Sequence, residues 1–268
     1  MPDRFPELTA LNRILHAMAG TTLAVAYSGG LDSRFVIHAA RLAGLDVLAL
    51  HVNGPHIPAH EHAYAVQWAR ACGIPLTVIP LNPLALPTLQ NNPEDRCYHC
   101  KTMIFTALRE AAGTLPLCDG TNASDLGEYR PGLNALKEQG IRSPLAEAGI
   151  AKQTIRDLAA ATGMENPTQA AQPCLLTRFA YGARLSPGQL ETVDKAEEAI
   201  RCVFTAHDQA DRPFRVRYEN AETPALHLTG EMPPPALLAA LAGVLGECGL
   251  PPLPVRTMGT LSGYFDRA

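Results

Sequence analysis

Long apolar segments are absent from this sequence. No stretch is apolar enough to cross a membrane, and Asp3, Arg4 and Glu7 interrupt the N-terminal region where a signal peptide would be apolar. A regular, even-numbered set of cysteines is also missing, since the seven cysteines do not match the disulfide framework of a secreted protein. We therefore expect a cytoplasmic protein with no membrane partner, whose thiols stay reduced and can bind metal or react.

An excess of basic residues is missing as well. The chain has 22 Lys and Arg against 26 Asp and Glu, for a formal net charge of −4. Proteins that bind long polynucleotides usually present a basic face, so this balance argues against a tRNA substrate. The 268 residues suffice for one large domain, or for one medium and one small domain, with a well-developed core, and the sequence contains no internal repeat.

A glycine-rich turn follows the apolar run at 23–27. It reads Ser28-Gly29-Gly30-Leu31-Asp32-Ser33. The glycines permit a tight turn and the close approach of an anion, and a helix beginning there adds partial positive charge. The common phosphate loop, Gly-x-x-x-x-Gly-Lys-Ser/Thr, is not present. The pattern predicts an ATP site; the alternative is an ordinary glycine-rich turn.

Short apolar runs alternate with segments of helical periodicity over the first half of the chain. This alternation is typical of an α/β protein with a parallel sheet covered by helices on both faces. Ligands of such sheets bind beyond the carboxyl ends of the strands. We expect an opening helix that ends at Gly20, strands at 22–27, 47–52, 76–80 and 115–119, helices at 34–43, 59–72 and 98–112, and a Pro/Asn-rich loop at 80–95.

The pattern changes near residue 186. Ser186-Pro187-Gly188-Gln189 is a strong helix start, with a capping serine, proline at the first helical position and glutamine three residues after the serine. We therefore predict one domain at 1–185 and a small α+β domain at 186–268. In the small domain we expect a helix to about 204, strands at 214–219, 225–229 and 253–257, and a helix at 234–248.

Three cysteines are candidates for chemistry. Cys97 and Cys100 form a Cys-x-x-Cys pair, which can bind metal, cycle as a disulfide or do neither. Cys174 follows a proline in an expected loop. Structural zinc normally takes four ligands, whereas three thiolates fit a four-iron cluster with one open iron. The other cysteines, at 72, 118, 202 and 248, are expected to be small buried structural residues.

Polar residues gather after the last strand of the expected sheet. They begin at Asp119 and could hold substrate, Mg²⁺ or phosphate, although a solvated loop is the alternative. Lys152 and Arg156 lie four apart on a helix and share one face, where plain surface charges are the alternative. Arg215 and Arg217 alternate along a strand, so both side chains point the same way and could bind phosphate.

Taken together, these motifs resemble the LarE family of ATP-dependent sulfur transferases, which build the nickel-pincer nucleotide cofactor of lactate racemase. They cover most of residues 22–200 in the family's order. Two parts, 120–122 and 144–152, also resemble NAD synthetases and identify only the wider superfamily. The matching segments are Ser28–Ser33, Asn92–Lys101, Asp119–Asn122, Arg130–Leu133, Ser143–Leu145 with Lys152 and Arg156, Pro173–Leu175, and Arg178 with Tyr181 and Gly182.

The resemblance implies a PP-loop ATP pyrophosphatase fold, similar to adenine nucleotide alpha hydrolases. ATP with Mg²⁺ would adenylate a carboxylate of pyridinium-3,5-biscarboxylic acid mononucleotide, and sulfur would then displace AMP to give a thiocarboxylate. The implied catalytic residues are Cys174, Cys97, Cys100, Lys101 and Arg130, and the implied cofactor-binding residues are Ser28, Gly29, Gly30, Asp32, Ser33, Gly120, Asn122, Asp125, Glu128, Lys152, Arg156, Arg178, Arg215 and Arg217.

The family has two sources of sulfur. In one branch the cysteine matching Cys174 gives up its sulfur and becomes dehydroalanine. In the other, three cysteines hold a [4Fe-4S] cluster that carries an extra sulfide. Because this chain has Cys97 and Cys100 as well as Cys174, it resembles the cluster branch.

Three other functions remain open at this stage. An amide-forming enzyme similar to NAD synthetases would need no cysteine, a tRNA thiolase would bind tRNA in a salt-sensitive way, and a regulatory protein would bind ATP without releasing pyrophosphate. We also expect a homo-oligomer. The C-terminal segment 254–264 lacks an acidic residue that the family pattern has, so a metal site or oligomer contact there does not carry over.

Overall fold

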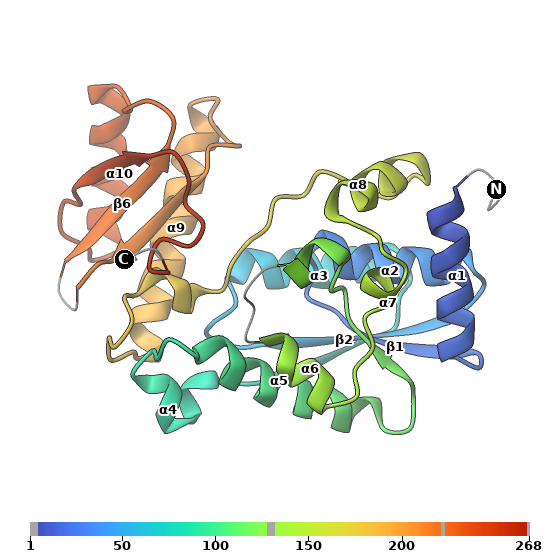
Figure 1. The fold of residues 1–268 in the computed structure, drawn as a ribbon. Helices are drawn as coiled ribbons and strands as arrows, with labels where there is room; N and C mark the ends of the chain where they lie inside the picture. The colour runs from blue at the N-terminus through green and yellow to red at the C-terminus, as the bar shows by residue number, and fades with distance from the viewer. Residues whose placement is uncertain (1–4, 128–131, 221–222, 267–268) are drawn as a thin grey trace. The chain divides into compact units, whose positions relative to one another are not determined.

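A computed structural model of the chain describes residues 5–127, 132–220 and 223–266 (Figure 1). The chain forms two compact units, each built from several segments. Unit 1 comprises Met1–Gly54, Glu61–Leu81 and Cys97–Gln172, and unit 2 comprises Pro55–His60, Asn82–Arg96 and Pro173–Ala268. None of the described helices combines the length and apolar character that crossing a membrane requires.

Unit 1 contains a parallel four-stranded sheet in the order β3-β2-β1-β4. Leu23 of β1 pairs with Val47 of β2, and Val25 pairs with Cys118 of β4. The sequence-based prediction of an α/β fold with a parallel sheet is therefore confirmed. The strands are β1 (Thr22–Ala26), β2 (Asp46–Asn53), β3 (Leu76–Pro80) and β4 (Leu117–Cys118).

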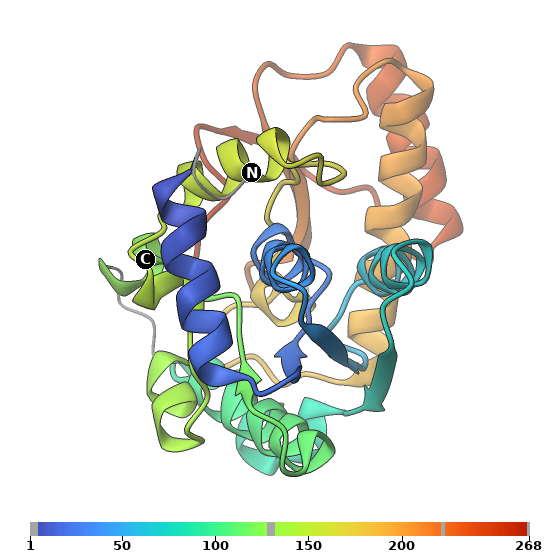
Figure 2. The same ribbon diagram turned by 90° about the vertical axis from the view of Figure 1, so that its right-hand side faces the viewer.

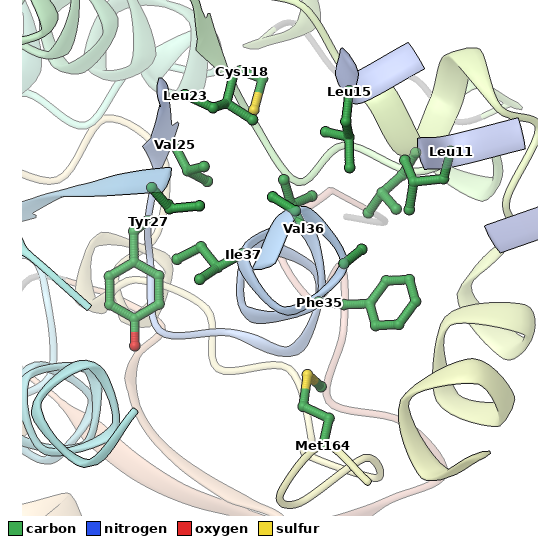
Figure 3. Close-up of a cluster of buried hydrophobic side chains, with 14 of the residues drawn as sticks. Leu11, Leu15, Leu23, Val25, Tyr27, Phe35, Val36, Ile37, Cys118 and Met164 are labelled. Carbon is green, nitrogen blue, oxygen red and sulfur yellow. The ribbon is translucent and has the colours of Figure 1, made fainter. Parts of the chain in front are cut away.

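The two faces of the sheet bury different helices, because successive strand side chains point to opposite faces. Leu23 and Val25 belong to a cluster that includes Phe35, Val36 and Ile37 from the helix after β1 (Figure 3). Ala24, between them, joins a second cluster with side chains from the helix that carries the Cys-x-x-Cys pair. Helices therefore cover both faces, as expected.

The helices of this region have defined places around the sheet. α1 packs against α2 and α7 and completes the first cluster (Figure 2). α5 and α6 supply the second cluster. The bounds are α1 (Pro6–Met18), α2 (Leu31–Leu42), α3 (Ala59–Ala71), α5 (Arg96–Ala112), η3 (Ala123–Gly127), α6 (Gly132–Glu138), α7 (Pro144–Glu147) and α8 (Lys152–Ala161).

Unit 2 is built on a three-stranded sheet in the order β5-β6-β7. β5 and β6 are antiparallel, whereas β6 and β7 are parallel. One face of this sheet packs against α9 and α10 through leucine, valine and phenylalanine side chains. The bounds are η2 (Pro83–Ala85), α4 (Pro87–Gln90), η4 (Leu175–Arg178), α9 (Pro187–Ala206), β5 (Phe214–Tyr218), β6 (Pro224–Thr229), α10 (Pro235–Glu247) and β7 (Val255–Met258).

Two local predictions were wrong. The expected loop at 80–95 contains η2 and α4, because Pro83 and Pro87 each start a short helical turn with the fixed φ that suits a first helical position. Of the four cysteines expected to be buried, only Cys118 is. Cys202 is exposed, because the apolar face of α9 is carried by residues such as Ile200 and Phe204, and Cys72 and Cys248 are half-buried. The capping box predicted at Ser186 and Gln189 is present.

Candidate functional site

The glycine turn joins β1 to α2 in unit 1. Gly29 has a φ of +83°, a conformation that side chains disfavour, and Gly30 is the N-cap of α2. The hydroxyls of Ser28 and Ser33 lie 3.2 Å apart, and Ser33 Oγ also donates to the Gly30 carbonyl at 3.0 Å. The first turn of a twelve-residue helix thus opens beside two hydroxyls, which is an arrangement suited to an anion.

Two glycines let neighbouring elements approach this turn. A Cβ on Gly29 would lie 2.7 Å from Cβ of Ala65 in α3, and a Cβ on Gly120 would lie 2.7 Å from the backbone nitrogen of Ser33. Both distances are too short for real atoms, so glycine is required at each position. The chain after β4 is therefore packed against the first turn of α2, which brings the turn and the loop beginning at Asp119 together.

An ion pair lies at the start of α2. Lys152 Nζ, from the first turn of α8, is 2.7 Å and 2.8 Å from the two carboxylate oxygens of Asp32. The backbone nitrogen of Lys152 donates to Ser124 Oγ at 3.1 Å, which fixes α8 to the loop after β4. The two predicted charged residues are therefore adjacent. If the pair separated, the Asp32 carboxylate could bind a metal ion and the Lys152 ammonium could bind a phosphate.

The loop after β4 is held by its own side chains. Asp119 is buried and accepts hydrogen bonds from Thr121 at 2.5 Å and from Ser143 at 2.7 Å. Burial raises the pKa of Asp119, and the two hydroxyls and the charge of Lys101 oppose that rise. Asn122 donates from its side chain to Asp125 at 2.9 Å. These hydrogen bonds join the loop to itself and to the start of α7 at Ser143.

The glycine turn is also held by a set of hydrogen bonds that was not predicted from the sequence, between Arg34 and the segment 165–169. Arg34 is fully buried in α2, and its guanidinium donates to the Glu165 carbonyl at 2.8 Å and to Gln169 Oε1 at 2.8 Å. Gln169 in turn donates to the Gly29 carbonyl at 3.2 Å. The only sequence signal was an arginine inside the apolar run of α2, and nothing in the pattern indicates its partner.

Two of the predicted sulfur ligands lie on α5. Cys97 is exposed in the first turn and Cys100 is buried one turn later. Lys101 follows directly, and its ammonium lies 5.8 Å from the centre of the Phe105 ring. Spacing of three residues places both thiols on one side of the helix.

The third predicted ligand, Cys174, belongs to unit 2, where it is the half-buried N-cap of η4. Within 5–127, 132–220 and 223–266, no three or more His, Cys, Asp or Glu side chains are grouped to hold a metal ion. Because Cys97 and Cys100 belong to the other unit, the three-thiolate site stays a prediction.

Arg178 holds the turn that carries Cys174. Its guanidinium donates to both oxygens of Glu197 at 2.8 Å and 2.9 Å, and also to Thr177 Oγ1 at 2.9 Å. Burial alone would raise the pKa of Glu197, but the charge and hydrogen bonds of Arg178 outweigh it and lower that pKa. The guanidinium that the resemblance implies to be cofactor-binding is therefore placed in a buried ion pair that fixes the cysteine turn.

Arg215 and Arg217 lie two residues apart on β5, so their side chains are on the same face of the strand, as predicted. Burial, with the nearby charges of Arg178 and Arg217, lowers the pKa of Arg215 to about 10, although the charge of Glu197 opposes this fall. Arg217 donates to the Leu261 carbonyl, lies 3.0 Å from His227 Nδ1 and stacks on Tyr264. Positive charge thus exceeds negative charge around Arg215, which favours an anion.

Arg156, Glu128 and Arg130 are the three remaining predicted site residues. Arg156 lies on α8 with Lys152, as the spacing predicted, and its Nε is buried without a hydrogen-bond partner in the described part of the chain. Glu128 and Arg130 lie outside the described residues.

Comparison with known proteins identifies relatives of the chain. No family model matches it. It is 38% identical over 181 residues to an uncharacterised protein of Synechocystis sp., covering 66% of the chain and 68% of that relative. It is 32% identical over 194 residues to an uncharacterised protein of Methanocaldococcus jannaschii, covering 71% and 73%.

A third relative carries a functional name. Over 182 residues the chain is 34% identical to a Lactiplantibacillus plantarum protein named pyridinium-3,5-bisthiocarboxylic acid mononucleotide synthase, and the match covers 66% of each protein. The chain therefore belongs to the family that the cyanobacterial and archaeal relatives represent, and its match to the named synthase supports membership of the LarE family.

Proposed function

We propose that this protein is an ATP-dependent sulfur transferase. Its substrate would be pyridinium-3,5-biscarboxylic acid mononucleotide, whose carboxylates become thiocarboxylates on the way to the nickel-pincer cofactor of lactate racemase. The observation that carries the proposal is the 34% identity to a protein named as the synthase of the bisthiocarboxylic acid mononucleotide. The glycine turn beside Asp32 and Lys152 supports it, because it offers the anion site that an ATP-dependent reaction needs.

ATP would bind at the glycine turn with Mg²⁺. Asp32 would exchange Lys152 for the metal ion, because a carboxylate oxygen is a preferred Mg²⁺ ligand. Lys152 would then contact the phosphates, and Lys101 and Arg130 would offset charge that develops as pyrophosphate leaves. Transfer of AMP to a substrate carboxylate is the purpose of this step, because a carboxylate is a poor electrophile and adenylation supplies a leaving group.

Sulfur would then attack the activated carboxyl carbon and displace AMP. Cys97, Cys100 and Cys174 are suited to hold a [4Fe-4S] cluster, since each is a thiol and three of them leave one iron open. Such a cluster supplies a site for an extra sulfide, and the alternative source is the sulfur of Cys174 itself. In both cases Arg178 fixes the turn that presents Cys174.

The mononucleotide phosphate would bind near Arg215. This guanidinium is half-buried beside three other arginines and a single carboxylate, Glu197, so a bound dianion would relieve repulsion among the cations. Arg217 contributes charge to the same face of β5, although its own hydrogen bonds go to the C-terminal segment.

The test combines ATP, Mg²⁺ and the biscarboxylic acid mononucleotide under anaerobic conditions, with pyrophosphate release and product mass as the two measurements. We expect pyrophosphate release with the natural chain and a product that carries sulfur. Cys174→Ala should release pyrophosphate but form no thiocarboxylate. Cys202→Ala is the matched control, because Cys202 is an exposed thiol on α9.

Three outcomes would contradict the proposal. Amide formation from ammonia by Cys174→Ala would indicate the NAD synthetase-like enzyme. Pyrophosphate release that depends on tRNA and declines with salt would indicate a tRNA thiolase. Binding of ATP without pyrophosphate release from any carboxylate would indicate a regulatory protein.

A further inference from the structure

Arg96 is one of the buried arginines of unit 2. It is 4% exposed and precedes Cys97 at the start of α5. Its Nε and Nη1 are buried and have no hydrogen-bond partner in the part of the chain that the structure describes. Its guanidinium carbon lies 4.4 Å from the centre of the Tyr181 ring. Two of the three guanidinium nitrogens are therefore buried and unpaired within the described residues, beside one aromatic face.

This arrangement differs from the other buried arginines. Arg34, Arg178 and Arg217 are at least as buried, yet each has a carbonyl, amide or carboxylate acceptor for its guanidinium, although Nε of Arg217 also makes no hydrogen bond within the described residues. An arginine stays charged at any ordinary pH, so Arg96 cannot escape the cost of burial by losing a proton. A cation–π contact recovers only a small part of that cost. The missing component is an acceptor, and the strongest one for a guanidinium is an oxyanion.

The backbone around Arg96 is fixed in advance of any ligand. Asn92, with a φ of +43°, donates from its side chain to the carbonyls of Phe179 and Ala180, both at 2.9 Å. Its own carbonyl accepts from the nitrogen of Gly182 at 3.1 Å. These bonds join the segment before Arg96 to the segment that carries Tyr181. The two side chains therefore meet without a bound ligand to hold them.

We propose that Arg96 and Tyr181 form an oxyanion subsite that binds a ring carboxylate of the substrate. This inference rests on the proposed function, which supplies the pyridinium dicarboxylate. A carboxylate matches a single planar guanidinium, because two parallel hydrogen bonds form and one negative charge meets one positive charge. A phosphate dianion is better matched by Arg215, which has other arginines beside it. The subsite orients the aromatic ring, and no covalent step occurs there.

The first experiment measures stability in the absence of ligand. Arg96→Met removes the charge and keeps a long side chain, so we expect its urea midpoint to be equal to or higher than that of the natural protein. Arg184→Met, at an exposed position nearby in sequence, is the control and should leave the midpoint unchanged. A clear fall in the midpoint of Arg96→Met alone would show that Arg96 serves the fold, and would overturn the proposal.

The second experiment measures binding by calorimetry, with pyridine-3,5-dicarboxylate and inorganic phosphate as separate probes. We expect Arg96→Met to bind the dicarboxylate at least tenfold more weakly, with phosphate binding unchanged and Arg184→Met equal to the natural protein. Loss of phosphate binding alone would assign the subsite to phosphate and overturn the carboxylate assignment. Equal binding of both probes by Arg96→Met would reject the subsite.

The binding assay contains no ATP and tests no sulfur chemistry. Its failure with intact thiocarboxylate formation would reject the subsite and leave the proposed function standing. The expected loss of dicarboxylate binding in Arg96→Met, in a protein that forms no thiocarboxylate, would support the subsite and reject the proposed function.

Discussion

Buried polar side chains differ in whether they have hydrogen-bond partners among the described residues. Arg34 and Arg178 have several acceptors each and stabilise the segments that they join. His56, in unit 2, has neither ring nitrogen hydrogen-bonded within the described residues and is 2% exposed. A side chain of this second kind favours its neutral form, so its effect on stability depends on pH.

Acid should destabilise the protein through His56. Burial lowers its pKa from 6.5 to about 4, so the unfolded chain takes up a proton at a higher pH than the folded chain. The contribution of neutral His56 to the free energy of unfolding is therefore fully present above pH 6.5. It is lost as the pH falls toward 4, by up to about 3 kcal/mol. Urea unfolding at pH 7 and pH 4.5 measures the difference for the natural protein and for His56→Phe.

The control for this experiment is His207→Gln, because His207 is exposed at the end of α9. We expect His207→Gln to retain the full loss between pH 7 and 4.5 and His56→Phe to retain only part of it. Burial also lowers the pKa values of His38 and His51. These two histidines account for part of the loss of stability that His56→Phe retains. An unchanged pH dependence in His56→Phe would contradict the prediction.

The Lys152–Asp32 pair should matter for nucleotide and little for stability. The side chains are 30% and 26% exposed, and pairs in contact with water contribute about 0–1 kcal/mol. Lys152→Met should therefore unfold within about 1 kcal/mol of the natural protein, yet raise the KM for ATP by roughly tenfold or more, because a phosphate contact is lost. Pyrophosphate release at varied ATP measures the KM. Lys195→Met, which removes an exposed ion pair with Glu191, should leave it unchanged.

Elements were predictable where their signals are local. Glycine and proline mark their ends, so the strand at Leu76–Pro80 and the capping box at Ser186 could be found from the sequence. β4 is only two residues long, since after Cys118 the chain bends to pack Gly120 against α2. That bend depends on a contact far away in the sequence. Arg34, Gln169 and Arg96 were missed for the same reason: their roles lie in distant partners.

Glycine at 29 should be required by packing as well as by conformation. Gly29 and Gly44 have similar φ values, +83° and +78°, but only a Cβ at 29 would collide with another residue, Ala65. Gly44→Ala should therefore cost about 1–2 kcal/mol for the left-handed backbone alone. Gly29→Ala should cost a further 1–3 kcal/mol from overpacking and should also weaken ATP binding.

Urea unfolding of the two variants, with titration of ATP, checks this comparison. Equal losses of stability in Gly29→Ala and Gly44→Ala would show that α3 yields at Ala65 and that packing does not fix the turn. The comparison is informative because Gly44 has nothing within 4 Å of its added Cβ.

On the scale of the whole molecule, the residues predicted to carry the chemistry are divided between the two units. Asp32, Lys152 and the Cys-x-x-Cys pair belong to unit 1, whereas Cys174 and Arg215 belong to unit 2. The predicted domain boundary at 185 and 186 remains a prediction. Periodicity describes each element separately, so it cannot tell that segments 55–60 and 82–96 pack with the C-terminal residues.

The predicted cluster would require thiolates from both units, which makes iron content a test of the assembled molecule. After anaerobic purification we expect bound iron and sulfide in the natural protein and the loss of both in Cys97→Ala and in Cys174→Ala, because each removes one of three ligands. Cys202→Ala should keep the full content, since its thiol is exposed on α9.

Iron and sulfide assays with an absorption spectrum provide the measurement. A colourless natural protein whose mass falls by one H₂S after turnover would contradict the cluster and identify Cys174 as the sulfur donor. Loss of iron in Cys97→Ala but not in Cys174→Ala would also contradict it, because the pair on α5 would then bind iron without unit 2. Equal loss of iron in the two variants is the outcome that the predicted three-thiolate site requires.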